Sequence, residues 1–319
     1  MTSIRIATRG SDLALVQARY VAGRIEAELG TETELVAIKT TGDRIQNVLL
    51  SKIGGKGLFV KEIEEALLDG RADVAVHSAK DLPALVADGL RLVAFPQRVD
   101  SRDALIGRKR GASVAELPSG ARVGTGSARR RAQIRCARPD LTIVALRGNV
   151  PTRLRKLDSD NLDAVVLACA GLDRLGLGDR IDERISPDTM LPAVAQGALA
   201  LEARRDDPIG RDIAKLDDGD TAICVAAERG FLLRIGGDCT VPLACLAELS
   251  DTRKLRVRAL LASADGSKIL RDELELDVGP GTEQADLETA ASGGARLADS
   301  VLAVGGSQLL EQLRSEADA

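Results

Sequence analysis

Residues 4–29 read IRIATRGSDLALVQARYVAGRIEAEL, and this stretch sets the pattern that much of the chain repeats. Residues 4–8 predict a short strand, and Ser11 is a residue type that favours helix N-caps. Apolar residues then recur at the spacing of one helix face, at Ala14, Ala18, Val21, Ile25 and Leu29. A strand followed by an amphipathic helix is the repeating unit of layered α/β folds. The stretch therefore predicts that fold class.

The same alternation continues to about residue 200. Strands are predicted at 35–39 and 73–77, with a helix between them that carries Phe59, Ile63, Ala66 and Leu67 on one face. Polar residues interrupt the pattern at 96–103, and a second set of strands follows at 103–107, 121–124, 141–146 and 163–167. We interpret the interruption as a crossing between domains. The strand-like residues 198–203 predict a return to the first domain.

The last third of the chain has a different pattern. A helix is predicted over 221–235, followed by strands at 243–249, 255–262 and 268–276 and helical patterns after residue 283. Asp265-Gly266 is a hairpin signal between the last two strands. A third, α+β unit is the expected result.

Composition narrows the functional classes. The chain has 319 residues, 45% hydrophobic and 29% charged, which suits a soluble protein of two or three domains. No apolar run reaches the ~20 residues of a membrane-spanning helix, and the N-terminus predicts a strand rather than a signal peptide, so we expect a cytoplasmic protein. The 5 cysteines form no Cys-x-x-Cys pair, which argues against disulfides and against a zinc site.

Charge is concentrated locally. The formal net charge is −4, yet arginines crowd between residues 129 and 138. This pattern favours a small anionic ligand over a long polyanion. Aromatic residues make up only 1% of the chain, which leaves little for bases to stack upon, so we do not expect nucleic-acid binding.

Several strand ends carry anion-binding residues. The stretch Gly124-Thr125-Gly126-Ser127-Ala128-Arg129-Arg130 combines a turn, a helix-capping serine and two arginines in the first helical turn. Cations are unfavourable there by roughly 0.3–1 kcal/mol each, so a bound anion explains them better than a solvated helix face does. Arg9 and the Arg147–Arg153 segment also follow strands, which predicts a ligand with several carboxylates or phosphates.

Four further groups could contribute to chemistry. Gly54-Gly55-Lys56-Gly57 lacks the Ser or Thr of a nucleotide-binding loop, so we interpret it as a mobile loop that presents Lys56. Asp81 follows a strand and is placed to stabilise a cation or shuttle a proton. His77, the single histidine, is expected in the core or behind the site. Cys239, in the loop 236–242, is a candidate nucleophile or attachment point, whereas the other cysteines suit buried positions.

These features leave two functions open. A two-lobed binding protein would explain the lobes and the arginines, but not a loop cysteine in a third domain. An enzyme that uses this cysteine as a nucleophile or attachment point would explain the cysteine as well.

Seven segments together resemble the porphobilinogen deaminase (hydroxymethylbilane synthase) family in the same order along nearly the whole chain: residues 7–15, 54–59, 77–83, 123–130, 146–153, 191–197 and 236–242. The resemblance implies a transferase of tetrapyrrole (haem) biosynthesis. It would condense four porphobilinogen molecules, with loss of ammonia, on a covalently bound dipyrromethane and then release hydroxymethylbilane by hydrolysis. The resemblance also implies a cytoplasmic monomer.

The implied fold has two lobes of the type II periplasmic-binding-protein kind and a small α+β third domain. The division is residues 1–97 with 198–217, residues 98–197, and residues 218–319. The active cleft would lie between the lobes, and the third domain would hold the cofactor cysteine on a loop.

The resemblance also implies roles for individual residues. Cys239 would form a thioether to the dipyrromethane, and Asp81 would hydrogen-bond pyrrole N–H groups, assist ammonia loss and stabilise the azafulvenium cation. The implied ligands of acetate and propionate groups are Arg9, Ser11, Arg129, Arg130, Arg147, Arg153 and Arg174. Cofactor or substrate contacts are also implied for Ser78, Lys80, Thr125 and Ser127, and a cleft-lining position for Gln17, Lys52, Lys56 and Gln196. Immediately before the cysteine the family usually has Gly or Ser, whereas this chain has Asp238. The like charge of Asp238 would raise the pKa of the Cys239 thiol.

Overall fold

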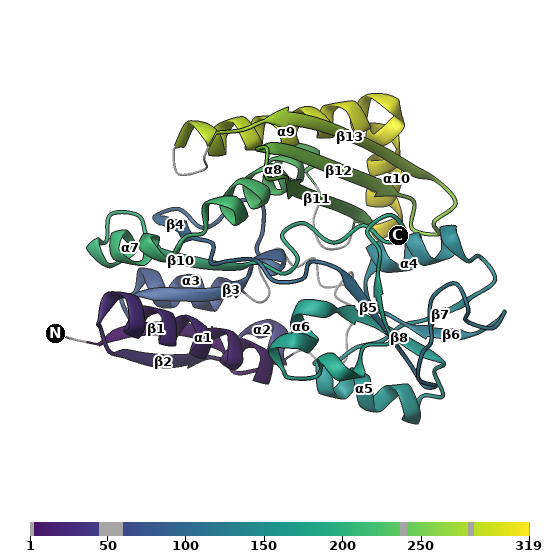
Figure 1. The fold of residues 1–319 in the computed structure, drawn as a ribbon, viewed down its shortest axis with the longest axis horizontal. Helices are drawn as coiled ribbons and strands as arrows, with labels where there is room; N and C mark the ends of the chain where they lie inside the picture. Colours follow the sequence, from purple (N-terminus) through teal and green to yellow (C-terminus); the bar gives the residue numbers. More distant parts are fainter. Residues whose placement is uncertain (1–2, 45–59, 237–240, 280–283, 319) are drawn as a thin grey trace.

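The computed structural model describes residues 3–44, 60–236, 241–279 and 284–318. Within these residues the chain forms two five-stranded sheets and one three-stranded sheet, each packed with helices (Figure 1). The two larger sheets belong to two lobes, and the third sheet belongs to a smaller domain that lies across both lobes in Figure 1.

The first lobe is built on a mixed sheet. Its strands, in spatial order, are β2 (Thr33–Ile38), β1 (Ile4–Arg9), β3 (Val74–Ser78), β10 (Leu199–Arg204) and β4 (Leu90–Ala94). β1 pairs in parallel with β2 and β3, whereas β10 runs antiparallel to β3 and β4. The lobe's helical segments are α1 (Asp12–Leu29), α2 (Thr41–Arg44), α3 (Lys61–Leu68), η2 (Ala79–Asp81), α7 (Pro208–Ile213) and η4 (Ala214–Leu216).

Helix α1 begins and ends where the sequence predicts. The Ser11 side chain caps its first turn by accepting a hydrogen bond from the Ala14 backbone N–H. Gly30 ends the helix in the left-handed conformation, at φ 65°. Ala18, Val21 and Ile25 are buried against the sheet, where they share one hydrophobic cluster with Ile6 of β1.

The second lobe repeats the strand order of the first. Its strands, in spatial order, are β7 (Thr142–Val144), β6 (Arg122–Gly124), β8 (Ala164–Ala168), β5 (Asp103–Gly107) and β9 (Glu183–Ile185). β6 is parallel to β7 and β8, and β5 is antiparallel to β8 and β9. The helical segments are α4 (Ala128–Ala137), α5 (Val150–Ser159), α6 (Cys169–Arg174) and η3 (Gly178–Arg180).

Two chain segments cross between the lobes, and they lie side by side. The first joins β4 to β5, and the second joins β9 to β10. Gly197 on the second has φ +91°, and a Cβ there would lie 2.6 Å from the Val99 carbonyl oxygen on the first. Glycine is therefore required where the two backbones approach.

The third domain packs helices on an antiparallel sheet. Its strands are β11 (Leu243–Leu249), β12 (Lys254–Ala262) and β13 (Ile269–Asp277), and its helical segments are α8 (Gly219–Ile235), α9 (Gln284–Val301), η5 (Leu302–Gly306) and α10 (Ser307–Asp318). One hydrophobic cluster joins α8 to Ala79 and Leu82 of the first lobe. Another joins β11 and β12 to Ala132 of α4 in the second lobe. The third domain therefore contacts both lobes.

The architecture confirms the predicted fold class: two type II periplasmic-binding-protein-like lobes and a small α+β domain. The predicted return to the first lobe is confirmed, because β10 enters its sheet between β3 and β4. The predicted hairpin at Asp265-Gly266 is also confirmed, with Gly266 at φ +77°. The edge strands β4 and β9 were not predicted.

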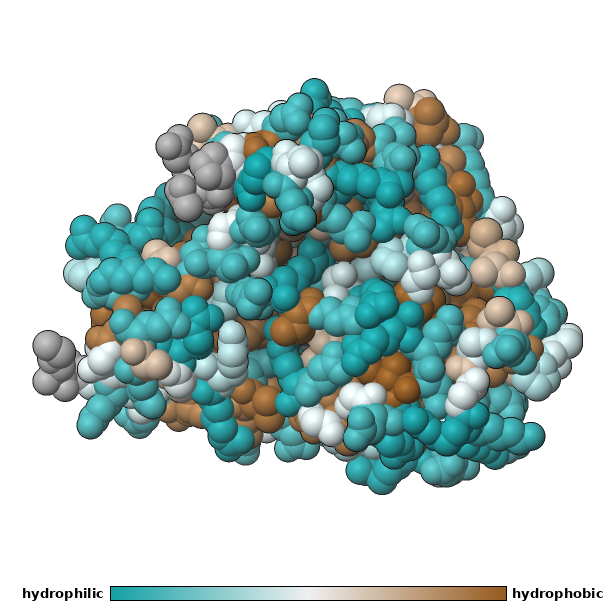
Figure 2. All heavy atoms as spheres, in the orientation of Figure 1, coloured by the Kyte–Doolittle hydropathy of each residue, from teal (hydrophilic) through white to brown (hydrophobic). Residues whose placement is uncertain are grey.

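The face shown in Figure 2 is mostly hydrophilic, with apolar residues in small separate groups. Among the described residues, no helix combines the length and the apolar character that crossing a membrane requires.

Candidate active site

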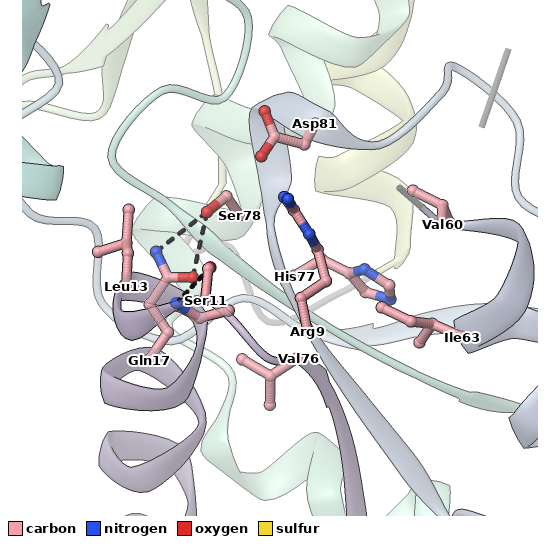
Figure 3. Close-up of a pocket in the computed structure, with 11 residues that line it drawn as sticks. Arg9, Ser11, Leu13, Gln17, Val60, Ile63, Val76, His77, Ser78 and Asp81 are labelled. Carbon is pink, nitrogen blue, oxygen red and sulfur yellow. Dashed lines mark hydrogen bonds between the residues drawn. The ribbon is translucent and has the colours of Figure 1, made fainter. Parts of the chain in front are cut away.

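A cavity of about 70 Å³ opens at the ends of strands β1 and β3 in the first lobe. Its walls come from β1, β3, η2, the first turns of α1 and the start of α3, and they carry Arg9, Ser11, Gln17, Ser78 and Asp81 (Figure 3). Parallel strands β1 and β3 are neighbours, so the residues that follow them meet at one sheet edge. The structure thus brings together candidates that lie far apart in the sequence.

Asp81 stands at the open side of this cavity. β3 ends at Ser78, and the chain then makes the single turn η2, which leaves the Asp81 side chain exposed. The Arg9 side chain points toward Asp81 in Figure 3. A carboxylate in this place can stabilise a cation that enters the cavity and can accept its hydrogen bonds.

Gln17 and Ser78 join helix α1 to strand β3 at the cavity wall. The Gln17 side-chain N–H donates to the Ser78 hydroxyl at 3.0 Å, and the same hydroxyl lies 3.1 Å from the Gln17 amide oxygen. Gln17 is buried. Ser11 also has a local task, because its hydroxyl caps α1.

His77 lines the cavity but is buried, and its Nε2 is 3.0 Å from a carboxylate oxygen of Glu202 on β10. The expectation of a buried histidine is confirmed, but His77 lies in the cavity wall and not behind it. Glu202 was not singled out in the sequence.

The turn before helix α4 forms the corresponding site in the second lobe. The Ser127 hydroxyl caps α4 by accepting from the Arg130 backbone N–H, as its position predicts. Thr125 is buried, and its hydroxyl accepts from the Ser127 backbone N–H at 3.3 Å. A Cβ at residue 126 would lie 2.6 Å from the Leu146 carbonyl oxygen, so the tight turn requires Gly126.

Arg129 and Arg130 are both buried, and both bind Asp103. Arg129 reaches the two Asp103 oxygens at 2.6 and 3.2 Å, and Arg130 reaches Oδ1 through Nε at 2.9 Å and NH2 at 2.7 Å. The alternative of a solvated helix face is wrong for these two residues. The sequence interpretation predicted a bound anion but missed that the chain itself supplies one for these arginines. That anion is the side chain of Asp103, the first residue of β5 after the first crossing.

Asp103 and the two arginines affect one another's pKa values. Burial opposes its ionisation, but the guanidinium groups of Arg129 and Arg130 outweigh burial and hold the pKa of Asp103 well below its usual range. Burial lowers the pKa of Arg130. The ion triplet is therefore charged and enclosed.

Lys80 and Gln196 connect this triplet to the first lobe. The fully buried Gln196 donates to Asp103 Oδ1 at 2.9 Å, and its amide oxygen accepts from Lys80 Nζ at 3.2 Å. Burial, and then the charge of Arg130, lower the pKa of Lys80 to about 8. Lys80 directly precedes Asp81 in the chain. Hydrogen bonds therefore connect the neighbour of Asp81, through Gln196, to Asp103 and its two arginines.

Arg153 and Arg174 approach the same region from other elements. Burial, followed by the charge of Arg130, lowers the pKa of Arg153 to about 10, while Asp81 across the cleft acts in the opposite sense. Arg153 donates to the Gly148 carbonyl at 2.7 Å. Arg174 donates to the Gly197 carbonyl in the second crossing at 2.8 Å, and burial lowers its pKa to about 10. Arg147 acts on Arg153 as a like charge.

Three of the predicted site residues lie outside the described residues: Cys239, Lys52 and Lys56. Helix α8 is described up to its C-cap, where Gly236 has the predicted left-handed conformation at φ 65°. Cys169, Cys224 and Cys245 are buried free thiols, as expected. Cys136 is exposed, so the prediction of a buried position is wrong for it. It lies near the C-terminal end of α4, where the helix turns toward solvent.

Two family descriptions match this chain. "Porphobilinogen deaminase, dipyromethane cofactor binding domain" covers residues 4–212, and "Porphobilinogen deaminase, C-terminal domain" covers residues 222–303. A porphobilinogen deaminase from Syntrophotalea carbinolica is 48% identical over 314 residues, which is 98% of this chain and 96% of the relative. One from Geobacter metallireducens is 48% identical over 313 residues, 97% of this chain and 94% of the relative.

Solved structures give more distant likenesses. An ABC-transporter periplasmic substrate-binding protein from Coxiella burnetii aligns with a TM-score of 0.42 at 15% identity, over 67% of this chain and 91% of that one. A periplasmic sulfonate-binding protein from Methylobacillus flagellatus aligns with a TM-score of 0.40 at 16% identity, over 72% of this chain and 67% of that one.

Proposed function

Because this chain belongs to the porphobilinogen deaminase family, we propose that Asp81 is its catalytic carboxylate and that Cys239 carries its cofactor. The chain is a transferase of tetrapyrrole biosynthesis, a hydroxymethylbilane synthase, and its cofactor is a dipyrromethane. Its substrate is porphobilinogen. The residues around the cleft divide into those that would hold the cofactor and those that would act on the substrate.

One observation carries the assignment of the anion-binding residues: within the described part of the chain, cations around the cleft outnumber the carboxylates that act on them. The charge of Arg130 acts on Lys80 and Arg153, and that of Arg129 acts on Lys80 and Arg130, while the carboxylates that act on this group are Asp81 and Asp103. Burial depresses the pKa of Lys80, Arg130 and Arg153, so an anionic ligand would relieve the excess of positive charge. The cofactor's carboxylates fit this requirement.

The dipyrromethane supplies, when bound, the terminal pyrrole to which substrate units are added. Lys80, Thr125, Ser127, Arg129 and Arg130 are the residues that we assign to its side chains. In the structure Thr125 and Ser127 build the turn before α4, and Arg129 and Arg130 follow in the first helical turn with their guanidinium groups on Asp103.

Asp81 would act on the substrate. Its carboxylate is exposed at the cavity mouth, where it can accept hydrogen bonds from a pyrrole N–H and stabilise positive charge as ammonia leaves. Arg9, Ser11, Arg147, Arg153 and Arg174 are proposed to bind substrate acetate and propionate groups. Gln17, Ser78 and Gln196 would shape the wall, and Lys52 and Lys56 would also contact the ligand.

The domain division supports the same arrangement. We propose the boundaries 1–97 with 198–217 for the first lobe, 98–197 for the second and 218–319 for the third domain. The two adjacent crossing segments, which precede β5 and β10, support these limits. We also propose a cytoplasmic monomer that binds no nucleic acid, and light scattering of the purified protein checks its mass in solution.

Intact-mass measurement tests the cofactor assignment. The Cys239→Ala variant should lose both the covalent mass increment of the dipyrromethane and all turnover of porphobilinogen. Cys136→Ala is the matched control, because Cys136 is the exposed cysteine among the described residues and lies on α4. It should keep the increment. An active Cys239→Ala enzyme with the normal increment would refute the assignment.

A further inference from the structure

We infer that Asp103 is a positioning residue that sets the two cofactor-binding arginines and, through Gln196, holds Lys80 beside the catalytic carboxylate. This inference rests on the proposed function of those arginines and goes beyond it. Asp103 is fully buried, begins strand β5 and lies directly after the first crossing between the lobes.

The hydrogen bonds of Asp103 leave the arginines with capacity for a ligand. A guanidinium carries five N–H donors. Arg129 uses its donors on Asp103 and the Leu191 carbonyl, and Arg130 uses its donors on Asp103 and the Val166 carbonyl. In each arginine these bonds account for three N–H groups. Among the described residues, two donors of each guanidinium therefore stay available to an incoming carboxylate.

Asp103 also limits repulsion between the arginines. Arg129 and Arg130 are consecutive, buried and of like charge, and both face the same carboxylate at 2.6–3.2 Å. Without that anion the two guanidinium groups would repel each other and turn toward solvent. A single carboxylate holds both in place but neutralises only one, so the pair keeps a net positive charge for the cofactor.

Gln196 extends this control to the first lobe. Its side-chain N–H groups donate to Asp103 Oδ1 at 2.9 Å and to the Ser101 carbonyl at 2.8 Å, which fixes the amide orientation. Its oxygen is then directed at Lys80 Nζ, 3.2 Å away. Asp103 therefore acts across the crossing segments, on a residue adjacent to Asp81.

The test compares Asp103→Asn with Asp100→Asn. Asp100 lies three positions earlier in the same crossing and binds Arg102 and Arg184, which we assign no role in the site. Apo enzyme from each variant is incubated with porphobilinogen, and the covalent increment is followed by intact mass. Asp103→Asn should assemble cofactor about 10- to 150-fold more slowly, the range for loss of a charge-assisted hydrogen bond. Asp100→Asn should assemble it at the normal rate.

A pH profile separates positioning from a general structural defect. The charged groups that act on Lys80 are Arg129 and Arg130 of α4, Asp81 of η2 and Asp103 of β5. Asp103 favours the charged form of Lys80, so Asp103→Asn should move the alkaline limb of cofactor assembly to lower pH. The limb should stay in place for Asp100→Asn. If Asp103→Asn does not fold, Asp103→Glu keeps the charge but shifts the carboxylate, and it should show the same slow assembly.

The outcomes distinguish this inference from the proposed function. Slow assembly in both Arg130→Leu and Asp103→Asn, with the alkaline limb of Asp103→Asn moved to lower pH, supports the cofactor role of Arg130 and the positioning role of Asp103. Normal assembly in Asp103→Asn or Asp103→Glu, together with an apo Arg130→Leu enzyme, overturns the role of Asp103 alone. Normal assembly in Arg130→Leu overturns the assignment of the arginine itself.

Discussion

Asp81 is exposed at the end of a single helical turn, one residue after Lys80, and the Arg9 side chain points toward it. This placement lets a carboxylate meet a cationic substrate without first leaving a buried ion pair. The substitution Asp81→Asn therefore separates the effect of the charge from that of side-chain position, because asparagine keeps the shape and removes the charge.

Asp81→Asn should lower turnover by several orders of magnitude while the cofactor remains attached. A site charge of this kind contributes about 3–4 kcal/mol to a transition state, or about 10²–10³ in rate, and lost proton transfer adds to it. Steady-state rates with porphobilinogen measure the effect. Asp88→Asn, an exposed carboxylate further along the same lobe, is the control. Retention of more than a tenth of normal turnover by Asp81→Asn would exclude the proposed role.

Lys80 predicts an alkaline limit on ligand binding. Its pKa is lowered to about 8 by burial and by Arg130, so it loses its proton as the pH rises through that value. Carboxylates bind the charged form, whereas porphobilinogen carboxyl groups, with ordinary pKa values of about 4, stay ionised throughout. The rate at which apo enzyme assembles its cofactor from porphobilinogen should therefore fall by roughly tenfold per pH unit above the pKa of Lys80.

The pH dependence of cofactor assembly by the apo enzyme, followed by intact mass, measures this limit. Lys80→Arg is the informative variant, because a guanidinium keeps its charge in this range and should flatten the decline. An identical decline in Lys80→Arg would assign the limit to another group.

At the scale of elements, helices α8 and α9 are in backbone contact. A Cβ at Gly294 would lie 1.9 Å from the Ala227 carbonyl oxygen, and one at Gly230 would lie 2.1 Å from that of Ala291. The two glycines therefore permit an approach that no other residue allows. The contact holds α8 in place up to Gly236, which is its C-cap and precedes the cofactor cysteine in the sequence.

Gly294→Ala should force these helices apart and destabilise the third domain by about 1–3 kcal/mol. Gly23→Ala is the matched control, since Gly23 lies inside helix α1 and its added Cβ would meet nothing within 4 Å. That change should stabilise the protein by roughly 0.5–1 kcal/mol. Urea unfolding of both variants checks the difference in sign, and equal behaviour would contradict the packing argument.

The sequence predicts elements better than it predicts their partners. Local periodicity is sufficient for α1, and the expected limits of β5, residues 103–107, are the observed ones. Periodicity carries no information about which distant residue faces an arginine, so it indicates Asp103 only as the start of a strand. Edge strands β4 and β9 escape prediction because the largely apolar residues 82–87 precede β4 and obscure where it begins, and two of the three residues of β9 are charged.

At the scale of the molecule, one buried carboxylate joins both crossing segments to the third domain. Glu228 of α8 binds Arg98 on the first crossing at 2.6 Å and accepts from the Ala195 backbone N–H on the second. It also accepts from the Ala247 N–H of β11 at 2.9 Å. The lobes and the third domain therefore meet at Glu228.

Glu228→Gln should destabilise the protein strongly, because it leaves the Arg98 guanidinium buried without its anion. Breaking a buried pair in this way costs about 3–5 kcal/mol. The midpoint of urea unfolding measures the loss. Asp299→Asn removes the half-exposed pair between Asp299 and Arg234 and should change the midpoint little. Equal shifts of the unfolding midpoint in the two variants would show that the Glu228 ion pair stabilises the protein no more than the half-exposed pair of Asp299.

The strand order has a consequence for synthesis on the ribosome. The second lobe completes its sheet at β9, which ends at Ile185, but the first lobe lacks the strand between β3 and β4 until β10 emerges after residue 199. Until then β3 and β4 have no partner between them. The lobe that is translated first is therefore finished last, and a nascent chain must protect two open strand edges while its second half is made.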